Sequence, residues 1–361
     1  MSELSRSQVE TALKNYVDPY LGADLVSTKC LKSVEVQGSK IALNVVLGFP
    51  CRSYEAQLKS DLVALLKSLD EGAEVSVKVD CKIASHAVQK GVEHLKNVKN
   101  IIAVASGKGG VGKSTVAVNL ALALSAEGAS VGVLDADIYG PSQPRMLGIS
   151  GQPDSKDGKS LEPMVSYGVQ AMSIGFLIDE ETPMIWRGPM VTQALEQLLK
   201  DTKWRDLDYL IIDLPPGTGD IQLTLAQKVP VSGAVIVTTP QDIALLDARK
   251  GLKMFEKVQV PVLGVVENMS THICSQCGHE EHIFGQGGGA RMAEQYKVDF
   301  LGALPLALAI REDADGGQPT VVKDPEGQIA RSYRDIARRV AAKLSLQAKD
   351  YSQAFPKIVI Q

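Results

Sequence analysis

A glycine-rich loop in the first third of the chain has the residue types that bind nucleotide phosphates. It follows the apolar run 101–105 and fits the pattern G-x-x-x-x-G-K-[ST] from Gly107 to Ser114. Glycines bring backbone N–H groups close to phosphate oxygens, while Lys113 can reach the β- and γ-phosphates and the Ser114 hydroxyl can bind Mg²⁺. A helix expected to start near Lys113 adds the positive end of its dipole. The residues predicted to contact the nucleotide here are Gly107, Lys108, Gly109, Gly110, Val111, Gly112, Lys113, Ser114 and Thr115.

The same loop also satisfies G-x-G-x-x-G, the pattern of dinucleotide-binding folds, and Asp135 stands where such a fold holds ribose. Two features favour a nucleoside triphosphate. The adjacent Lys113 and Ser114 supply the cation and the hydroxyl that a triphosphate and Mg²⁺ require, and the apolar run 209–212 ends in Asp213, a carboxylate expected beside Mg²⁺. The guanine-recognition pattern Asn-Lys-x-Asp does not occur in the sequence, which favours ATP.

Two closely spaced cysteines, Cys274 and Cys277, form a C-x-x-C pair that can share one metal centre. A thioredoxin-type redox pair is expected earlier in its fold. A zinc site within one chain would need His279 and His282 as well, which crowds four ligands into nine residues. Two such pairs from two subunits would instead give four thiolates, which suit a [4Fe–4S] cluster, with Zn²⁺ as a substitute. A pair of surface cysteines without a ligand is the remaining alternative.

Composition restricts the function classes. The chain has 361 residues, a net charge of −4 and 5% aromatic residues, which argues against nucleic-acid binding driven by bulk charge or base stacking. No apolar run is long enough to span a membrane, and the polar start of the chain does not read as a secretory signal, so no membrane partner is expected. Five cysteines are too few for a disulfide scaffold, so a reducing cytoplasm is the expected location.

The pattern of the remaining sequence predicts two unequal parts. After residue 100, short apolar runs alternate with helical stretches, which predicts an α/β fold with a mostly parallel twisted sheet flanked by helices. The strands expected there are 101–105, 131–134, 209–212, 234–238 and 262–266. The predicted organisation is a small domain over 1–82, a linker over 83–99, the nucleotide-binding domain over 100–346 and a tail over 347–361.

The first part is expected to be a small α+β domain with the order α-β-β-α-β. A capping box of Ser7 and Glu10 would open its first helix. Its second helix is expected over 53–69, with five leucines on one apolar face, of which Leu69 is the last. The expected strands are 31–36, 41–47 and 74–79.

Five strings of the sequence together resemble the Mrp/ApbC family, P-loop ATPases of the ParA/MinD class that carry and deliver iron–sulfur clusters. The resemblance covers about residues 98–345, and residues 1–82 resemble the MIP18-like domain often fused to these proteins. The strings are GKGGVGKST (107–115), DADIYGPS (135–142), WRGPM (186–190), DLPPGTGD (213–220) and ENMS-x₃-C-x₂-C-G (267–278).

The resemblance implies a nucleotide-sandwich homodimer, in which Lys108 reaches the nucleotide of the neighbouring subunit. It also implies that Asp137 orients the attacking water, that Gly217 offers its N–H to the γ-phosphate and that Asn268 reads adenine. A turn-forming role is the alternative for Asn268. The catalytic residues implied are Lys108, Lys113 and Asp137, the Mg²⁺ ligands are Ser114 and Asp213, and the cluster ligands are Cys274 and Cys277.

The activity implied is slow ATP hydrolysis coupled to transfer of a [4Fe–4S] cluster to apo iron–sulfur proteins. The main alternative is a MinD/ParA-like positioning ATPase with a structural zinc clasp, which would use a membrane-binding or DNA-binding segment. The helical stretch 329–346 has few large apolar residues for membrane insertion. A nickel-insertion ATPase would be expected to carry a His-rich tract, which the sequence lacks, and an oxidoreductase would have to bind NAD(P)H better than ATP.

Overall fold

The computed structural model describes residues 5–89, 91–178, 188–274 and 276–350. The chain divides into two compact units, one comprising Met1–Ser85 and Ala341–Gln361 and the other comprising His86–Val340. Each unit has its own sheet, and the two are described separately below. The expected tail 347–361 lies mostly outside the described residues.

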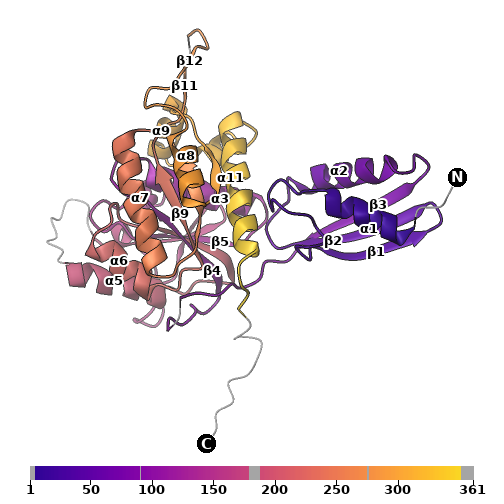
Figure 1. The fold of residues 1–361 in the computed structure, drawn as a ribbon. Coiled ribbons are helices and arrows are strands. Elements are labelled where there is room, and N and C mark those ends of the chain that lie inside the picture. The colour runs from indigo at the N-terminus through magenta and orange to yellow at the C-terminus, as the bar shows by residue number, and fades with distance from the viewer. Residues whose placement is uncertain (1–4, 90, 179–187, 275, 351–361) are drawn as a thin grey trace, which may run out of the picture. The chain divides into compact units, whose positions relative to one another are not determined.

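The first unit has the predicted order of elements, α-β-β-α-β (Figure 1). Its sheet has the strand order β1-β2-β3, in which β1 and β2 are antiparallel and β2 and β3 are parallel. Side chains on one face of β2 are buried in alternation, as a strand with one covered face requires. The elements are α1 (Arg6–Asn15), β1 (Leu31–Gln37), β2 (Lys40–Leu47), α2 (Glu55–Lys67) and β3 (Glu74–Cys81).

Two local expectations for this unit are wrong. The capping box at the start of α1 is formed by Ser5 and Gln8, not by Ser7 and Glu10: the Gln8 N–H donates to Ser5 Oγ at 3.3 Å, and the Ser5 N–H donates to Gln8 Oε1 at 2.8 Å. The first turn therefore begins earlier than the Ser-x-x-Glu spacing suggests. Leu69 is 46% exposed because α2 ends at Lys67, which takes this leucine off the helical face.

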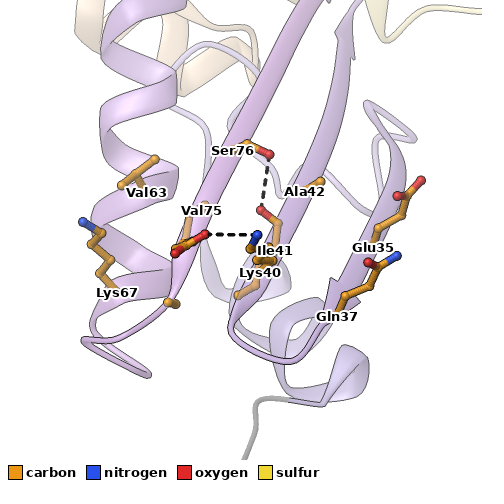
Figure 2. A pocket seen from close by; sticks show the side chains of 11 residues that line it. Glu35, Gln37, Lys40, Ile41, Ala42, Val63, Lys67, Val75 and Ser76 are labelled. Carbon is orange, nitrogen blue, oxygen red and sulfur yellow. Dashed lines mark hydrogen bonds and ion pairs between the residues drawn. The ribbon is translucent and has the colours of Figure 1, made fainter.

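A hollow of about 540 Å³ lies in the first unit, between the end of α2 and the sheet (Figure 2). Lys40 and Glu74 cross it as an ion pair at 3.8 Å, and Ser76 Oγ donates to the Ile41 carbonyl at 3.5 Å. The side chains that line it are of mixed charge, and none of them is a cysteine or a histidine. The hollow therefore offers no thiol or imidazole as a metal ligand.

The second unit is built on an eight-stranded sheet with the order β13-β10-β9-β4-β8-β5-β7-β6. Every pairing is parallel except that of β6 with β7, so the predicted fold class is confirmed. The strands are β4 (Val98–Ala105), β5 (Val131–Asp135), β6 (Met164–Ser166), β7 (Val169–Ser173), β8 (Leu207–Asp213), β9 (Gly233–Thr238), β10 (Val262–Glu267) and β13 (Phe300–Ala303). All five predicted strands are present, and the sequence analysis missed the three strands nearest the sheet edges, β6, β7 and β13.

Helices pack on this sheet and enclose an apolar core. Helix α3 contacts β5 and β8, α7 contacts β9, and α8 contacts β10. Strand β9 and nearly all of β8 are buried along their length, as parallel strands covered on both faces are expected to be. The helices are α3 (Lys113–Ala126), α4 (Gln143–Met146), α5 (Gly188–Asp201), α6 (Asp220–Lys228), α7 (Asp242–Lys257), α8 (Gly288–Tyr296), α9 (Leu308–Asp315), α10 (Thr320–Lys323) and α11 (Gln328–Ser345), with a 3₁₀ turn at Ile174–Phe176.

The parallel sheet brings distant loops together, because the carboxyl ends of parallel strands lie along the same edge. Strand β4 lies between β8 and β9, and β5 lies beside β8. The glycine-rich segment follows β4, Asp213 is the last residue of β8, and Asp137 follows β5. Asn268 follows β10, which lies beyond β9 in the sheet. A two-stranded hairpin, β11 (His272–Ile273) and β12 (Glu280–Glu281), follows β10 and projects from the unit (Figure 1).

Within the described ranges, no helix combines the length and the apolar character needed to cross a membrane.

The first unit offers a test of its small core. Leu62 is fully buried on α2, so Leu62→Ala removes packed side-chain atoms and should lower the free energy of unfolding by about 2–5 kcal/mol. Leu69→Ala, at the exposed leucine, is the matched control and should change it by less than about 0.5 kcal/mol. Urea unfolding of the full chain, followed by circular dichroism, measures both. Equal losses in the two variants would contradict the described end of α2.

Candidate functional site

The glycine-rich loop takes its shape from two glycines with positive φ and one with no room for a side chain. Gly110 and Gly112 both have φ of +80°, and Gly112 is the N-terminal cap of α3. A Cβ on Gly107 would lie 2.1 Å from the backbone carbon of Asp247 on α7. The loop is therefore pressed against α7, and its first glycine is required by that contact.

A buried ion pair stands at the centre of the site. Lys113 Nζ pairs with the Asp213 carboxylate and also donates to Ser114 Oγ at 3.1 Å. Lys113 is 6% exposed and Asp213 is fully buried. A carboxylate removed from water needs such a partner, because a buried charge without one is strongly unfavourable. The structure thus brings together three residues that the sequence predicts for phosphate and Mg²⁺ binding.

A carboxylate and a hydroxyl oxygen are ligands that Mg²⁺ accepts. Asp213 and Ser114 both contact one ammonium group, so their oxygens border the same small space. These two residues therefore fit the predicted magnesium site.

Asp135 organises the loop that follows β5. Its carboxylate accepts hydrogen bonds from the backbone N–H groups of Asp137, Ser142 and Gln143 at 3.1, 2.9 and 3.0 Å. The Ser173 hydroxyl contacts the same carboxylate at 3.3 Å. Complete burial is the main cause that raises the pKa of Asp135, and the nearby Asp213 carboxylate raises it further. Its bonds all run to its own loop and to β7, which makes it an organising group for the segment that carries Asp137.

Asp137 is half-buried at the same edge of the sheet. Burial raises its pKa, the Lys113 ammonium opposes that change, and the Asp213 carboxylate adds to it. The charges of Lys113 and Asp213 both act on Asp137, which is consistent with its place beside this ion pair. Its predicted part in orienting water is untested by this geometry and stays a prediction.

Two groups that are predicted to contact the nucleotide make hydrogen bonds within the chain. The Gly217 N–H donates to the Ser106 carbonyl at 3.0 Å, so it would have to leave this partner to reach a phosphate. The Asn268 amide donates to the Val111 carbonyl at 2.9 Å, and a Cβ on Gly112 would lie 2.2 Å from Asn268 Nδ2. Asn268 therefore holds the glycine-rich loop, and its reading of adenine stays a prediction.

Lys108 is the half-exposed second lysine of the loop. Its carbonyl accepts a hydrogen bond from Ser106 Oγ at 2.9 Å, and its ammonium forms no ion pair with a described residue. The side chain is consequently available to an anion outside the chain's own contacts. Of the string WRGPM, Gly188–Met190 begin α5, whereas Trp186 and Arg187 lie outside the described residues.

One buried polar residue of this site, Gln143, was not predicted from the sequence. Its amide contacts both the Asp213 carboxylate and the Ser114 carbonyl, at 2.9 and 3.1 Å. No chemical pattern marks it in the sequence, because it follows the string DADIYGPS and its partners are far away along the chain. Only the placement of β8 beside β5 brings these residues together.

The two cysteines of the C-x-x-C pair lie in the turn between β11 and β12. The Cys274 N–H donates to the His279 carbonyl and the Gly278 N–H donates to the Cys274 carbonyl, both at 2.9 Å. Cys277 is exposed and Cys274 is half-buried. Hydrogen bonds from the backbone N–H groups of Cys277 and Gln276 lower the pKa of the Cys274 thiol, which favours the thiolate that binds metals.

The two histidines beside the pair have other contacts. His282 Nδ1 lies 2.9 Å from the Ser270 carbonyl, and His279 Nε2 lies 3.9 Å from Glu281 Oε1. Across the ranges that the structure describes, no three His, Cys, Asp or Glu side chains gather as a metal site. The alternative of a four-ligand zinc site within one chain thus finds no support among them.

Comparison with known proteins identifies relatives of both units. A family model described as NUBPL iron-transfer P-loop NTPase matches residues 97–341, and one described as iron-sulfur cluster assembly protein matches residues 6–79. An iron-sulfur cluster carrier protein of Escherichia coli strain K12 is 52% identical over 348 residues, covering 96% of this chain and 94% of the relative. A protein of the same description from Pseudomonas fragi is 62% identical over 274 residues, covering 75% and 96%.

Among solved structures, the nucleotide-binding protein from Archaeoglobus fulgidus in complex with ADP is 38% identical, with a TM-score of 0.56. The match covers 64% of this chain and 90% of that protein.

The central ion pair generates a prediction with two parts. Lys113→Ala should abolish ATP turnover, and it should also lower the free energy of unfolding by about 3–5 kcal/mol, because the buried Asp213 carboxylate loses its partner. The double variant Lys113→Ala/Asp213→Asn removes the unpaired charge, so it should regain most of the stability and none of the turnover. Phosphate release and urea unfolding measure the two effects. Normal turnover in the single variant would contradict the assignment of this loop.

Proposed function

Because this chain belongs to the NUBPL iron-transfer P-loop NTPase family, we propose that it hydrolyses ATP and carries an iron–sulfur cluster to apo-proteins. Membership confirms the family expected from the five sequence strings. One observation supports the joint activity most directly. A single stretch of chain after β10 carries Asn268, which is bonded to the glycine-rich loop, and, six residues later, Cys274 of the C-x-x-C pair.

In the proposed ATPase site, the backbone of the glycine-rich loop and the Lys113 ammonium bind the phosphates. Ser114 and Asp213 would hold Mg²⁺, which when bound would supply positive charge to the phosphate oxygens. Asp137 orients the water that attacks the γ-phosphate, and ADP is the leaving group. The half-buried position of Asp137 beside Lys113 and Asp213 supports this role.

In the proposed cargo site, Cys274 and Cys277 of each of two subunits hold one [4Fe–4S] cluster. The exposure of Cys277 and the lowered pKa of Cys274 support thiolate ligation. One chain contributes two thiols, and a cubane cluster requires four ligands, so the cluster would stand between two copies. Zn²⁺, which also accepts four thiolates, is the expected substitute.

The proposed assembly is a homodimer in which Lys108 of one subunit reaches the nucleotide of the other. The absence of an ion pair for Lys108 among described residues supports this interpretation. Hydrolysis would then alter how the two subunits hold the cluster. The proposed location is the cytoplasm, where cysteine thiols stay reduced. The proposed clients are apo iron–sulfur proteins, and no nucleic-acid or membrane partner is proposed.

Cluster binding is tested by anaerobic reconstitution of the full chain with iron and sulfide. The wild type should take up about four irons per dimer with visible cluster absorption, and Cys274→Ala/Cys277→Ala should take up none while it still binds ATP. Cys81→Ala, at an exposed cysteine of the first unit, is the matched control and should retain the cluster. Incubation of the loaded protein with an apo-enzyme that needs a [4Fe–4S] cluster should restore the activity of that enzyme.

Two outcomes would overturn the proposal. If the double cysteine variant kept its cluster, the ligands would lie elsewhere in the chain. If the wild type took up one Zn²⁺ per dimer and no stable cluster, the C-x-x-C pair would be a structural clasp, and the positioning ATPase would become the favoured function.

A further inference from the structure

Gln143 is a buried amide at the junction of three segments of the ATPase site. It is the first residue of α4 and is 1% exposed. Its backbone N–H donates to the Asp135 carboxylate at 3.0 Å, which fixes its position in the loop after β5. Its side chain reaches away from that loop to β8 and to the first turn of α3.

Gln143 and Lys113 each contact one oxygen of the Asp213 carboxylate. Gln143 Nε2 donates to Asp213 Oδ2 at 2.9 Å, whereas Lys113 Nζ pairs with Asp213 Oδ1. The same Nε2 donates to the Ser114 carbonyl at 3.1 Å. The plane of the Asp213 carboxylate is therefore set from both of its oxygens, and it is tied to the residue whose hydroxyl is the second predicted Mg²⁺ ligand.

The other end of the amide is unpartnered. Gln143 Oε1 is buried and accepts no hydrogen bond from a described residue. Buried acceptors without a donor are rare, because the loss of solvation is not compensated. The two donor contacts of Gln143 are enough to join β8 to the loop after β5. In that role alone, burial of Oε1 without a donor would only destabilise the fold. A donor that arrives with the ligands of the site removes that cost.

We propose that Gln143 is a positioning residue for the hydrated magnesium ion of the ATPase. Its amide nitrogen donates to the Asp213 carboxylate and to the Ser114 carbonyl, and its Oε1 accepts a hydrogen bond from a water molecule bound to Mg²⁺. This ion retains several of its waters in nucleotide sites, and each is a strong hydrogen-bond donor. The inference rests on the proposed magnesium site at Ser114 and Asp213, and it adds an outer contact that no sequence motif marks.

The test measures magnesium binding separately from turnover. Isothermal titration with ADP, in the presence and absence of Mg²⁺, gives the gain in affinity that the metal provides. In Gln143→Met, which replaces the amide with an apolar side chain of similar length, this gain should fall about tenfold or more, as expected when a hydrogen bond to a charged group is lost. Affinity for ADP without Mg²⁺ should stay within about twofold, because the Gln143 amide contacts the Asp213 carboxylate and the Ser114 carbonyl, and neither of these oxygen atoms is expected to bind phosphate. The Mg²⁺ concentration for half-maximal ATPase activity should rise in parallel.

Gln170→Met is the matched control. Gln170 is a glutamine of β7 whose amide makes two hydrogen bonds of 2.9 Å with the backbone of Arg205, away from the ATPase loops. Its loss should leave the magnesium gain unchanged. Gln143→Leu provides a second apolar variant if the methionine variant folds poorly.

Asp213→Asn separates failure of this inference from failure of the proposed function. If Asp213→Asn loses the magnesium gain and Gln143→Met retains it, the inference about Gln143 is overturned and the magnesium site stands. If Asp213→Asn also retains the gain, the magnesium site itself is misassigned, and the inference falls with it. Loss of the gain in both variants, with Gln170→Met unchanged, supports the positioning role.

Discussion

One buried ammonium group, that of Lys113, supports the arrangement of the whole nucleotide site. It compensates the fully buried Asp213 carboxylate, and Asp135 lies close enough for its pKa to be raised by the same carboxylate. Two acidic residues at the ends of neighbouring strands can therefore be buried beside one cation. This pair fixes the end of β8 against the first turn of α3, and the Lys113 ammonium contacts both residues whose oxygen atoms suit Mg²⁺, Asp213 and Ser114.

The glycine-rich loop also needs neighbouring backbone segments to approach it closely, and glycine residues make that approach possible. Gly107 touches the backbone of α7, and Gly112 leaves room for the amide of Asn268, which in turn holds the Val111 carbonyl. The loop is thus clamped between the helix that follows β9 and the segment that follows β10. The latter segment continues into the hairpin with the two cysteines, so a short stretch of chain joins the loop's contact at Asn268 to the proposed cargo site.

The two chemical sites differ in how complete they are within one chain. At one edge of the sheet, the Lys113 ammonium contacts both the Asp213 carboxylate and the Ser114 hydroxyl. The cysteine hairpin projects outward and, among described residues, brings no third metal-binding side chain to Cys274 and Cys277. The proposed cargo site, which needs four thiolates, would take two of them from a second copy, and Lys108, which forms no ion pair with a described residue, is available for the proposed homodimer.

The sequence by itself determined the features that depend on residues close together in the chain. The glycine-rich loop, the C-x-x-C pair and the alternation of strands and helices are readable because consecutive residues share one backbone segment. The tertiary structure decided the contacts between segments: Gln143 with Asp213, Asn268 with Val111, and the Gly217 N–H with the Ser106 carbonyl. These depend on which strands are neighbours in the sheet. Spacing along the chain does not encode that order, which arises from how the apolar faces of all the elements pack together.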